Sequence, residues 1–160
     1  MADGGASNMI LLVTSLLICG AASGILLQSW TETASSVGIN QEQLALDSKT
    51  KLTFSGDLAK TVFNDVDDRI DIFLQNSGSS ILDENEFGAF VEGQPASIFA
   101  GPTFLNGATS WSPGVVVKYT LNIEAGHVTG DELRITAVVA TVTSGGVVGS
   151  DSVTEVIKLG

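Results

Sequence analysis

Residues 9–27 read MILLVTSLLICGAASGILL and contain no charged side chain. At ~1.5 Å per residue, a helix over this stretch is about 28 Å long, and the flanking segments 6–8 and 28–30 extend it past the roughly 30 Å core of a bilayer. Three hydroxyl residues interrupt the run, Thr14, Ser15 and Ser23, and each can bond to a backbone carbonyl one helical turn earlier. The stretch therefore predicts a membrane-spanning helix, with Trp30 at the membrane interface.

Two other interpretations of this stretch stand beside the anchor. A cleavable secretory signal is also apolar and N-terminal, but no Lys or Arg precedes the run, and residues 21–23 make only a loose cleavage site. The run is also longer than the core of such a signal. A helix buried in a soluble core needs a large protein around it, and the remaining chain is too short to surround it. We therefore expect an uncleaved anchor.

Gly20 and Gly24 stand four residues apart among other small side chains. This spacing lets the backbone of another helix approach closely, so we predict a helix-packing face at these two glycines, in a membrane or in a filament core. Glycine is also common in membrane helices in general, and that alternative stays open. The lone Cys19 is expected to pack as a small residue, and a single cysteine forms no intrachain disulfide.

The charge of the chain lies almost entirely beyond the apolar stretch. Residues 37–160 carry 16 of the 18 acidic residues and all 7 basic residues, a net charge of −9. This charge argues against nucleic acid or an anionic lipid surface as a partner of that part of the chain. No basic residue precedes Lys49, so charge asymmetry does not indicate the orientation of the helix in a membrane.

Residues 37–40, Val-Gly-Ile-Asn, are typical of a helix end. We predict two parts, the hydrophobic helix with its stem over 1–36 and a β domain over 37–160. Short runs rich in Val, Ile, Thr and Phe follow, separated by Gly, Ser, Asn and Asp. Strands are expected over 43–47, 49–54, 69–75, 86–91, 97–100, 115–123, 133–143 and 147–159, with a hairpin turn at 144–146.

This series predicts an all-β fold, an immunoglobulin-like antiparallel β-sandwich preceded by one hydrophobic α-helix. No disulfide joins the sheets, so apolar burial alone must hold them together. The aromatic side chains expected between the sheets are Phe54, Phe63, Phe73, Phe90, Trp111 and Tyr119.

Few residues suggest chemistry. His127, with Glu124 and Asp131 nearby, has the residue types of a general base or a metal ligand, but no second histidine exists, and a solvated loop residue is the favoured interpretation. The acidic loops 64–68 and 83–86 are rich in oxygen ligands for Ca²⁺, yet they lack EF-hand spacing, and charged surface loops are favoured. The sequence predicts no enzyme, no cofactor and no metal site.

Two stretches resemble a known family. Residues 69–82, RIDIFLQNSGSSIL, are similar to a strand that ends in Asn-[Ser/Thr]-Gly, and residues 111–114, WSPG, precede a Val-rich strand. Together with the helix, stem and sandwich, they resemble the archaellum accessory proteins G and F (FlaG and FlaF), with the closer likeness to G. The related archaellins and archaeal pilins share these features. Those filament subunits usually carry Lys or Arg before Gly at a processing site, whereas Gly4 here follows Asp3.

The resemblance implies a stator scaffold of the archaeal motility machinery. The helix would lie in the cytoplasmic membrane and the sandwich outside the cytoplasm, beneath the S-layer, where it would contact copies of itself, other archaellum proteins and the S-layer protein. The alternative is an archaellin- or pilin-like subunit of an extracellular filament, whose helix packs in the filament core. An alternative of another class is a membrane-tethered ligand-binding or enzymatic domain that uses His127.

Overall fold

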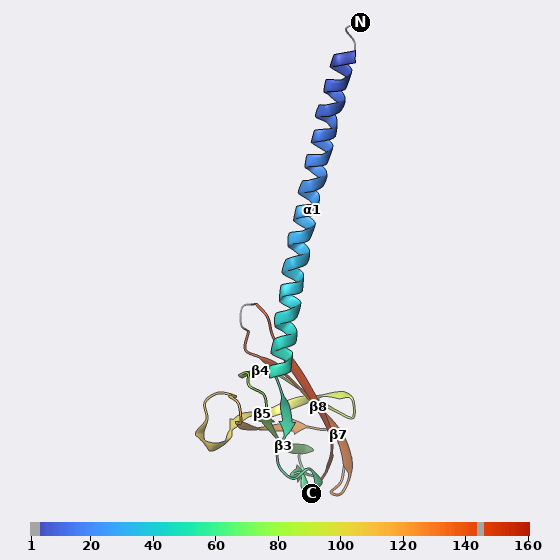
Figure 1. The fold of residues 1–160 in the computed structure, drawn as a ribbon. Helices are drawn as coiled ribbons and strands as arrows, with labels where there is room; N and C mark the ends of the chain where they lie inside the picture. Colours follow the sequence, from blue (N-terminus) through green and yellow to red (C-terminus); the bar gives the residue numbers. More distant parts are fainter. Residues whose placement is uncertain (1–3, 144–145) are drawn as a thin grey trace. The chain divides into compact units, whose positions relative to one another are not determined.

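The structure is a computed structural model that describes residues 4–143 and 146–160. The chain divides into two compact units, Met1–Gln41 and Glu42–Gly160. The described residues of the first unit, 4–41, are helical, and the second unit holds the last turns of the helix and the strands. Figure 1 shows the helix α1 in blue to cyan and the strands in green to red.

The helix α1 spans Gly4–Lys49, so the predicted helix end at residues 37–40 is wrong. Residues 43–47, predicted as a strand, are helical. The sequence QEQLALD over 41–47 consists largely of good helix formers, and this propensity outweighs the alternation of Leu44 and Leu46 that suggested a strand. Leu44 is 69% exposed, which shows that the alternation does not mark a buried face.

The other predicted strands are present, with shifted ends. The elements are β1 (Leu52–Phe54), η1 (Leu58–Lys60), β2 (Phe63–Asn64), β3 (Arg69–Asn76), β4 (Leu82–Val91), β5 (Gln94–Phe104), η2 (Leu105–Gly107), β6 (Val116–Asn122), β7 (Glu132–Thr141) and β8 (Ser150–Lys158). The predicted hairpin turn at 144–146 falls partly outside the described residues. The strands on either side of it, β7 and β8, pair antiparallel along nine residue pairs from Glu132↔Lys158 to Ala140↔Ser150.

The strands form the antiparallel sandwich that the sequence predicted. One sheet has the order β1-β3-β6-β5 and the other β4-β7-β8, and β5 joins them because its first residues pair with β4 and its later residues with β6. If β1 and β3 to β8 are lettered A to G, the orders are ABED and CFG, the arrangement of immunoglobulin constant domains. The short β2 adds to β3.

Alternating side chains of both sheets build one hydrophobic core. Strand β3 alternates strictly between half-buried and buried residues, and its buried side chains meet those of β6 and β7. Three aromatic rings lie at the centre of the core, where Phe87 stacks on Tyr119 with 4.0 Å between ring centroids and Trp111 packs against both. The buried residues of these three strands are Ile70, Ile72, Leu74, Asn76, Val117, Tyr119, Leu121, Leu133, Ile135, Ala137, Val139 and Thr141.

The aromatic predictions are confirmed in part. Trp111 and Tyr119 are each 1% exposed, and Phe54 and Phe63 pack against the core from its margin. Phe73 and Phe90 are not core residues, because Phe73 lies on the half-buried face of β3 and Phe90 is 38% exposed on β4. Phe87 occupies an inward position on β4 instead, together with Ala89 and Val91, so alternation places Phe90 on the other face.

The buried hydroxyl of Tyr119 makes the stability of the fold depend on pH in the alkaline range. It donates a hydrogen bond to the carbonyl oxygen of Glu84 at 3.2 Å. Burial, and then the nearby charges of Glu84 and Asp83, raise the pKa of Tyr119 above its ordinary value of about 10. Because the folded-state pKa is raised, the neutral hydroxyl stabilises the fold fully below about pH 10, and this contribution is lost as the pH rises further.

We expect Tyr119→Phe to reduce the loss of stability at high pH. The free energy of unfolding of the unmodified chain should fall by up to about 1.4 kcal/mol more per pH unit above pH ~10 than that of the variant. At pH 7 the variant should lose ~0.5–1.5 kcal/mol, the contribution of one hydrogen bond. Urea unfolding of the full chain in detergent between about pH 8 and pH 12 measures both effects. Parallel pH profiles would contradict the assignment.

Candidate functional site

The first candidate surface is the apolar part of α1. Between residues 9 and 27, every large apolar side chain is at least 57% exposed. The helix is long and apolar enough to cross a membrane, by length and composition. A helix that is apolar on all sides requires lipid or other helices around it. The eleven exposed residues are Met9, Ile10, Leu11, Leu12, Val13, Leu16, Leu17, Ile18, Ile25, Leu26 and Leu27.

The polar side chains within this stretch are bonded to the helix itself, as predicted. The hydroxyl of Thr14 donates to the carbonyl of Ile10 at 2.6 Å, and that of Ser23 donates to the carbonyl of Cys19 at 2.8 Å. Ser15 bonds to Leu12 in the same way, at 3.0 Å. None of these three hydroxyls therefore needs a partner from a surrounding apolar medium.

Gly20, Gly24 and Trp30 remain predictions as contact residues. A Cβ atom added at either glycine would meet nothing within 4 Å, so the space above both positions is open to a neighbouring helix. Trp30 is 75% exposed, near the end of the apolar stretch. This exposure leaves the indole free to lie at an interface.

The second candidate surface is the junction at which the last turns of α1 join the sandwich. On one side, the carboxylate of Asp47 accepts a hydrogen bond from the backbone N–H of Ser150 at 2.8 Å. The side-chain amide of Gln43 donates to the carbonyl of Val148. Gly149 lies between these two contacts, and a Cβ atom there would stand 2.6 Å from the hydroxyl of Thr50. The loop before β8 therefore packs closely against the helix.

On the other side, the turn after β3 caps the helix end. The backbone N–H groups of Ser79 and Ser80 donate to the carbonyl of Lys49 at 2.8 and 3.3 Å. A Cβ atom at Gly78 would lie 2.2 Å from that same carbonyl oxygen. Glycine is required at this position because only a residue without a side chain lets the two backbones come so close.

Asn76 holds this turn in place. Its side-chain amide is fully buried and donates to the carbonyls of Ser80 at 2.8 Å and Trp111 at 2.9 Å, while its side-chain oxygen accepts from the N–H of Gly78 at 3.0 Å. The two stretches that carry the family resemblance, 69–82 and 111–114, thus meet at Asn76. We did not foresee this junction, although the Asn-Ser-Gly turn was its visible signal.

The residues considered for chemistry do not form a metal site. The Nδ1 atom of His127 lies 3.8 Å from a carboxylate oxygen of Asp131, beside an open cleft of about 310 Å³. The carboxylate of Asp67 pairs with Arg69 at 3.3 Å, and that of Asp83 accepts from the N–H of Asn85 at 2.9 Å. Within the described ranges, no group of three or more His, Cys, Asp and Glu side chains could hold a metal ion.

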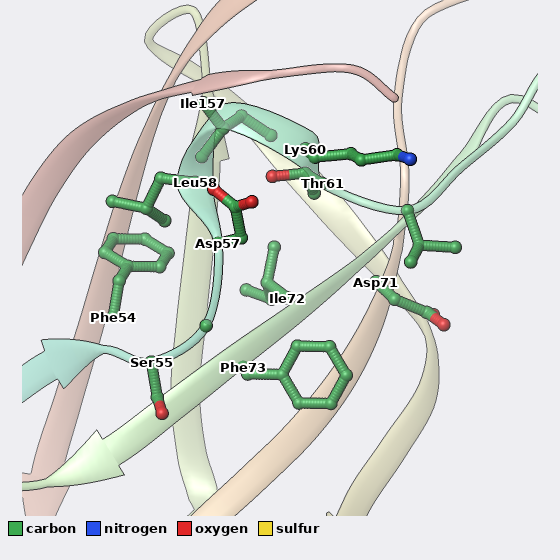
Figure 2. Close-up of a pocket in the computed structure, with 12 residues that line it drawn as sticks. Phe54, Ser55, Asp57, Leu58, Lys60, Thr61, Asp71, Ile72, Phe73 and Ile157 are labelled. Carbon is green, nitrogen blue, oxygen red and sulfur yellow. The ribbon is translucent and has the colours of Figure 1, made fainter.

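A small cleft opens between β1, η1 and β3 (Figure 2). Phe54, Leu58, Phe73 and Ile157 contribute apolar side chains to it, and Figure 2 shows the carboxylate of Asp57 between them. Its volume is about 90 Å³. Pockets for small molecules and cofactors measure about 300–1,000 Å³, so this cleft at the margin of the core is smaller than a typical ligand pocket.

A known structure has a similar fold over nearly the whole chain. A chain in the solved structure of the archaeal flagellum of Methanospirillum hungatei strain JF1 matches with a TM-score of 0.57 and 12% sequence identity. The match covers 97% of this chain and 94% of that chain, so it includes both the long helix and the sandwich. No family model matches the sequence, and no curated protein matches it. At this identity, the likeness shows a common fold.

We expect Gly20→Leu and Gly24→Leu to weaken association of the full chain in detergent. Each leucine fills the space through which another helix backbone would approach, and the dissociation constant should rise by about tenfold or more, or ~1.4 kcal/mol. The matched control is Ala22→Leu, since residue 22 points to the other side of the helix from residue 20. Sedimentation equilibrium measures the constants. Equal constants for all three variants would contradict a packing face at the glycines.

Proposed function

We propose that the chain is a structural component of an archaellum-type motility machine. The observation that carries this proposal is the likeness over 97% of the chain to a chain of an archaeal flagellum, because it includes the helix and the sandwich in the same order. In this role the helix is embedded in a membrane, and the sandwich makes protein contacts outside the cytoplasm. The role requires no catalytic residue, and His127→Ala is expected to leave it unchanged.

The exposed helix supports this proposal energetically. Covering a Leu, Ile or Met side chain fully contributes about 1.5–3 kcal/mol. For the eleven exposed side chains between residues 9 and 27, lipid or neighbouring helices would contribute on the order of 10 kcal/mol or more. This is comparable to the whole free energy of unfolding of a typical domain. The helix is therefore the strongest attachment that the chain offers.

The finer part of the proposal is an accessory or stator role. Asp3 precedes Gly4-Gly5, and the first basic residue is Lys49, so the N-terminal sequence departs from the Lys/Arg-Gly pattern of processed filament subunits. An unprocessed helix stays in the membrane, and the sandwich then stands outside it as a fixed mount. Its partners in this role are copies of itself, other archaellum proteins and the S-layer protein.

A filament subunit is the second candidate. The observation in its favour is that the similar chain comes from the flagellum itself and is matched over 94% of its own length. In this role, copies of α1 pack together in a filament core, and the sandwiches form its surface. The packing face at Gly20 and Gly24 serves either role, so it does not choose between them.

The two roles differ in the mature N-terminus and in location. We expect the chain produced in archaeal cells to keep residues 1–5 and to remain with the membranes after the filaments are sheared off. Mass spectrometry of both fractions measures this. Asp3→Lys is the control, because it places a basic residue directly before Gly4 and should make processing detectable. A processed chain found mainly in sheared filaments would establish the second candidate, and a chain found in neither fraction would contradict both.

A further inference from the structure

The junction described above is built as a latch, by which we mean residues 42–50 with the two segments that hold them, 76–80 and 148–151. The segment 76–80 connects β3 of one sheet to β4 of the other, and 148–151 leads into β8. Hydrogen bonds from both segments reach the helix end, from Ser79 and Ser80 to the Lys49 carbonyl and from Ser150 to the Asp47 carboxylate. The helix end is thereby attached to both sheets.

The chain immediately after the helix is fixed by the same segments. The carboxylate of Asp151 accepts from the N–H of Leu52 at 2.8 Å and pairs with Lys51 at 3.5 Å. The carbonyl of Lys51 accepts from Ser77 at 3.0 Å and Gly78 at 3.1 Å. The attachment therefore extends from the last turns of α1 into β1.

The helix side of the latch, residues 42–50, lies outside the hydrophobic core. The core cluster begins at Leu52 and includes none of residues 42–50. Within those residues only Thr50 is buried, while Gln43, Leu46 and Asp47 are half-buried. Hydrogen bonds and close backbone packing at Gly78 and Gly149, rather than apolar burial, hold the helix end in place. Contacts of this kind can open locally at a lower free energy than the core.

We propose that this latch is the mechanical coupling between α1 and the sandwich, and that opening it uncouples the two while both stay folded. A force applied along the helix is then transmitted to both sheets rather than to a single edge strand. The inference concerns how the sandwich is held by its own helix, so it applies both to a helix in a membrane and to one in a filament core. It stands or fails independently of the proposed function.

Hydrogen exchange of the full chain in detergent tests the coupling. Gly149→Ala opens one side of the latch, because the new Cβ would lie 2.6 Å from the Thr50 hydroxyl and 2.9 Å from a backbone carbon of Leu46. Asp47→Leu removes the acceptor of the Ser150 N–H on the same side without changing a glycine. Gly88→Ala is the control, since a Cβ atom at that strand position meets nothing within 4 Å.

We expect the amides of Thr50 and Ser150 to exchange about tenfold faster or more in both latch variants, the effect of one lost hydrogen bond. The core amides of Ile72 and Tyr119 should exchange as in the unmodified chain. The Gly88→Ala control should change neither set. Equal acceleration of exchange at the latch and core amides would overturn the proposal, because the latch would then unfold together with the core as one cooperative unit. Unchanged exchange at the latch amides would also overturn it.

A distance measurement gives a second test. Spin labels at Leu44→Cys on the helix end and Val156→Cys on β8, in a Cys19→Ser background, lie at exposed positions of the sandwich unit. The distance distribution should be narrow in the otherwise unmodified chain and at least about twofold broader with Gly149→Ala or Gly78→Ala. A broad distance distribution in the chain without a latch substitution would contradict coupling through the latch. A distribution that stays narrow in the Gly149→Ala variant and in the Gly78→Ala variant would also contradict it.

Discussion

The large apolar side chains between residues 9 and 27 have no cover within the described part of the chain. Exposing eleven large apolar side chains to water is unfavourable compared with covering them. The difference in free energy is about as large as the whole free energy of unfolding of a typical domain. The helix must therefore lie in lipid or against other helices. The sandwich, in contrast, buries a hydrophobic core of its own.

The sandwich is attached to the end of that helix by contacts from two of its segments. Its immunoglobulin-like strand order brings the turn after β3 and the loop before β8 to the same helix end. The buried amide of Asn76 fixes the turn by bonding to Trp111, whose ring belongs to the central aromatic cluster. The turn that caps the helix is thus bonded directly to a core residue.

Much of the fold could be predicted from local pattern. Strand β3 alternates strictly along RIDIFLQN, and an apolar run without charge predicts the helix directly. The helix end could not be predicted in this way, because Val-Gly-Ile-Asn at 37–40 has the composition of a stop, whereas the good helix formers over 41–47 continue the helix to Lys49. The buried face of β4 could not be predicted either, because each face of the strand carries one phenylalanine, Phe87 on the inner face and Phe90 on the outer.

In the candidate site, too, local features could be predicted from the sequence and contacts between distant segments could not. The self-bonded hydroxyls of Thr14 and Ser23 followed from helix geometry alone. The junction did not, because Asp47 and Ser150 are 103 residues apart and nothing in either segment by itself indicates the contact. Gly78 belongs to an Asn-Ser-Gly turn that the sequence indicates, whereas the need for glycine at 149 is evident only once the neighbouring backbone of the helix is known.

The exposed apolar side chains of the helix require lipid or other helices around them. Sedimentation velocity of the full chain and of residues 42–160, each with and without detergent, measures this requirement. We expect residues 42–160 to stay in solution as a folded species without detergent, and the full chain to need detergent or to sediment as large assemblies. A full chain that sediments as a soluble monomer in detergent-free buffer would show that the helix has no such requirement.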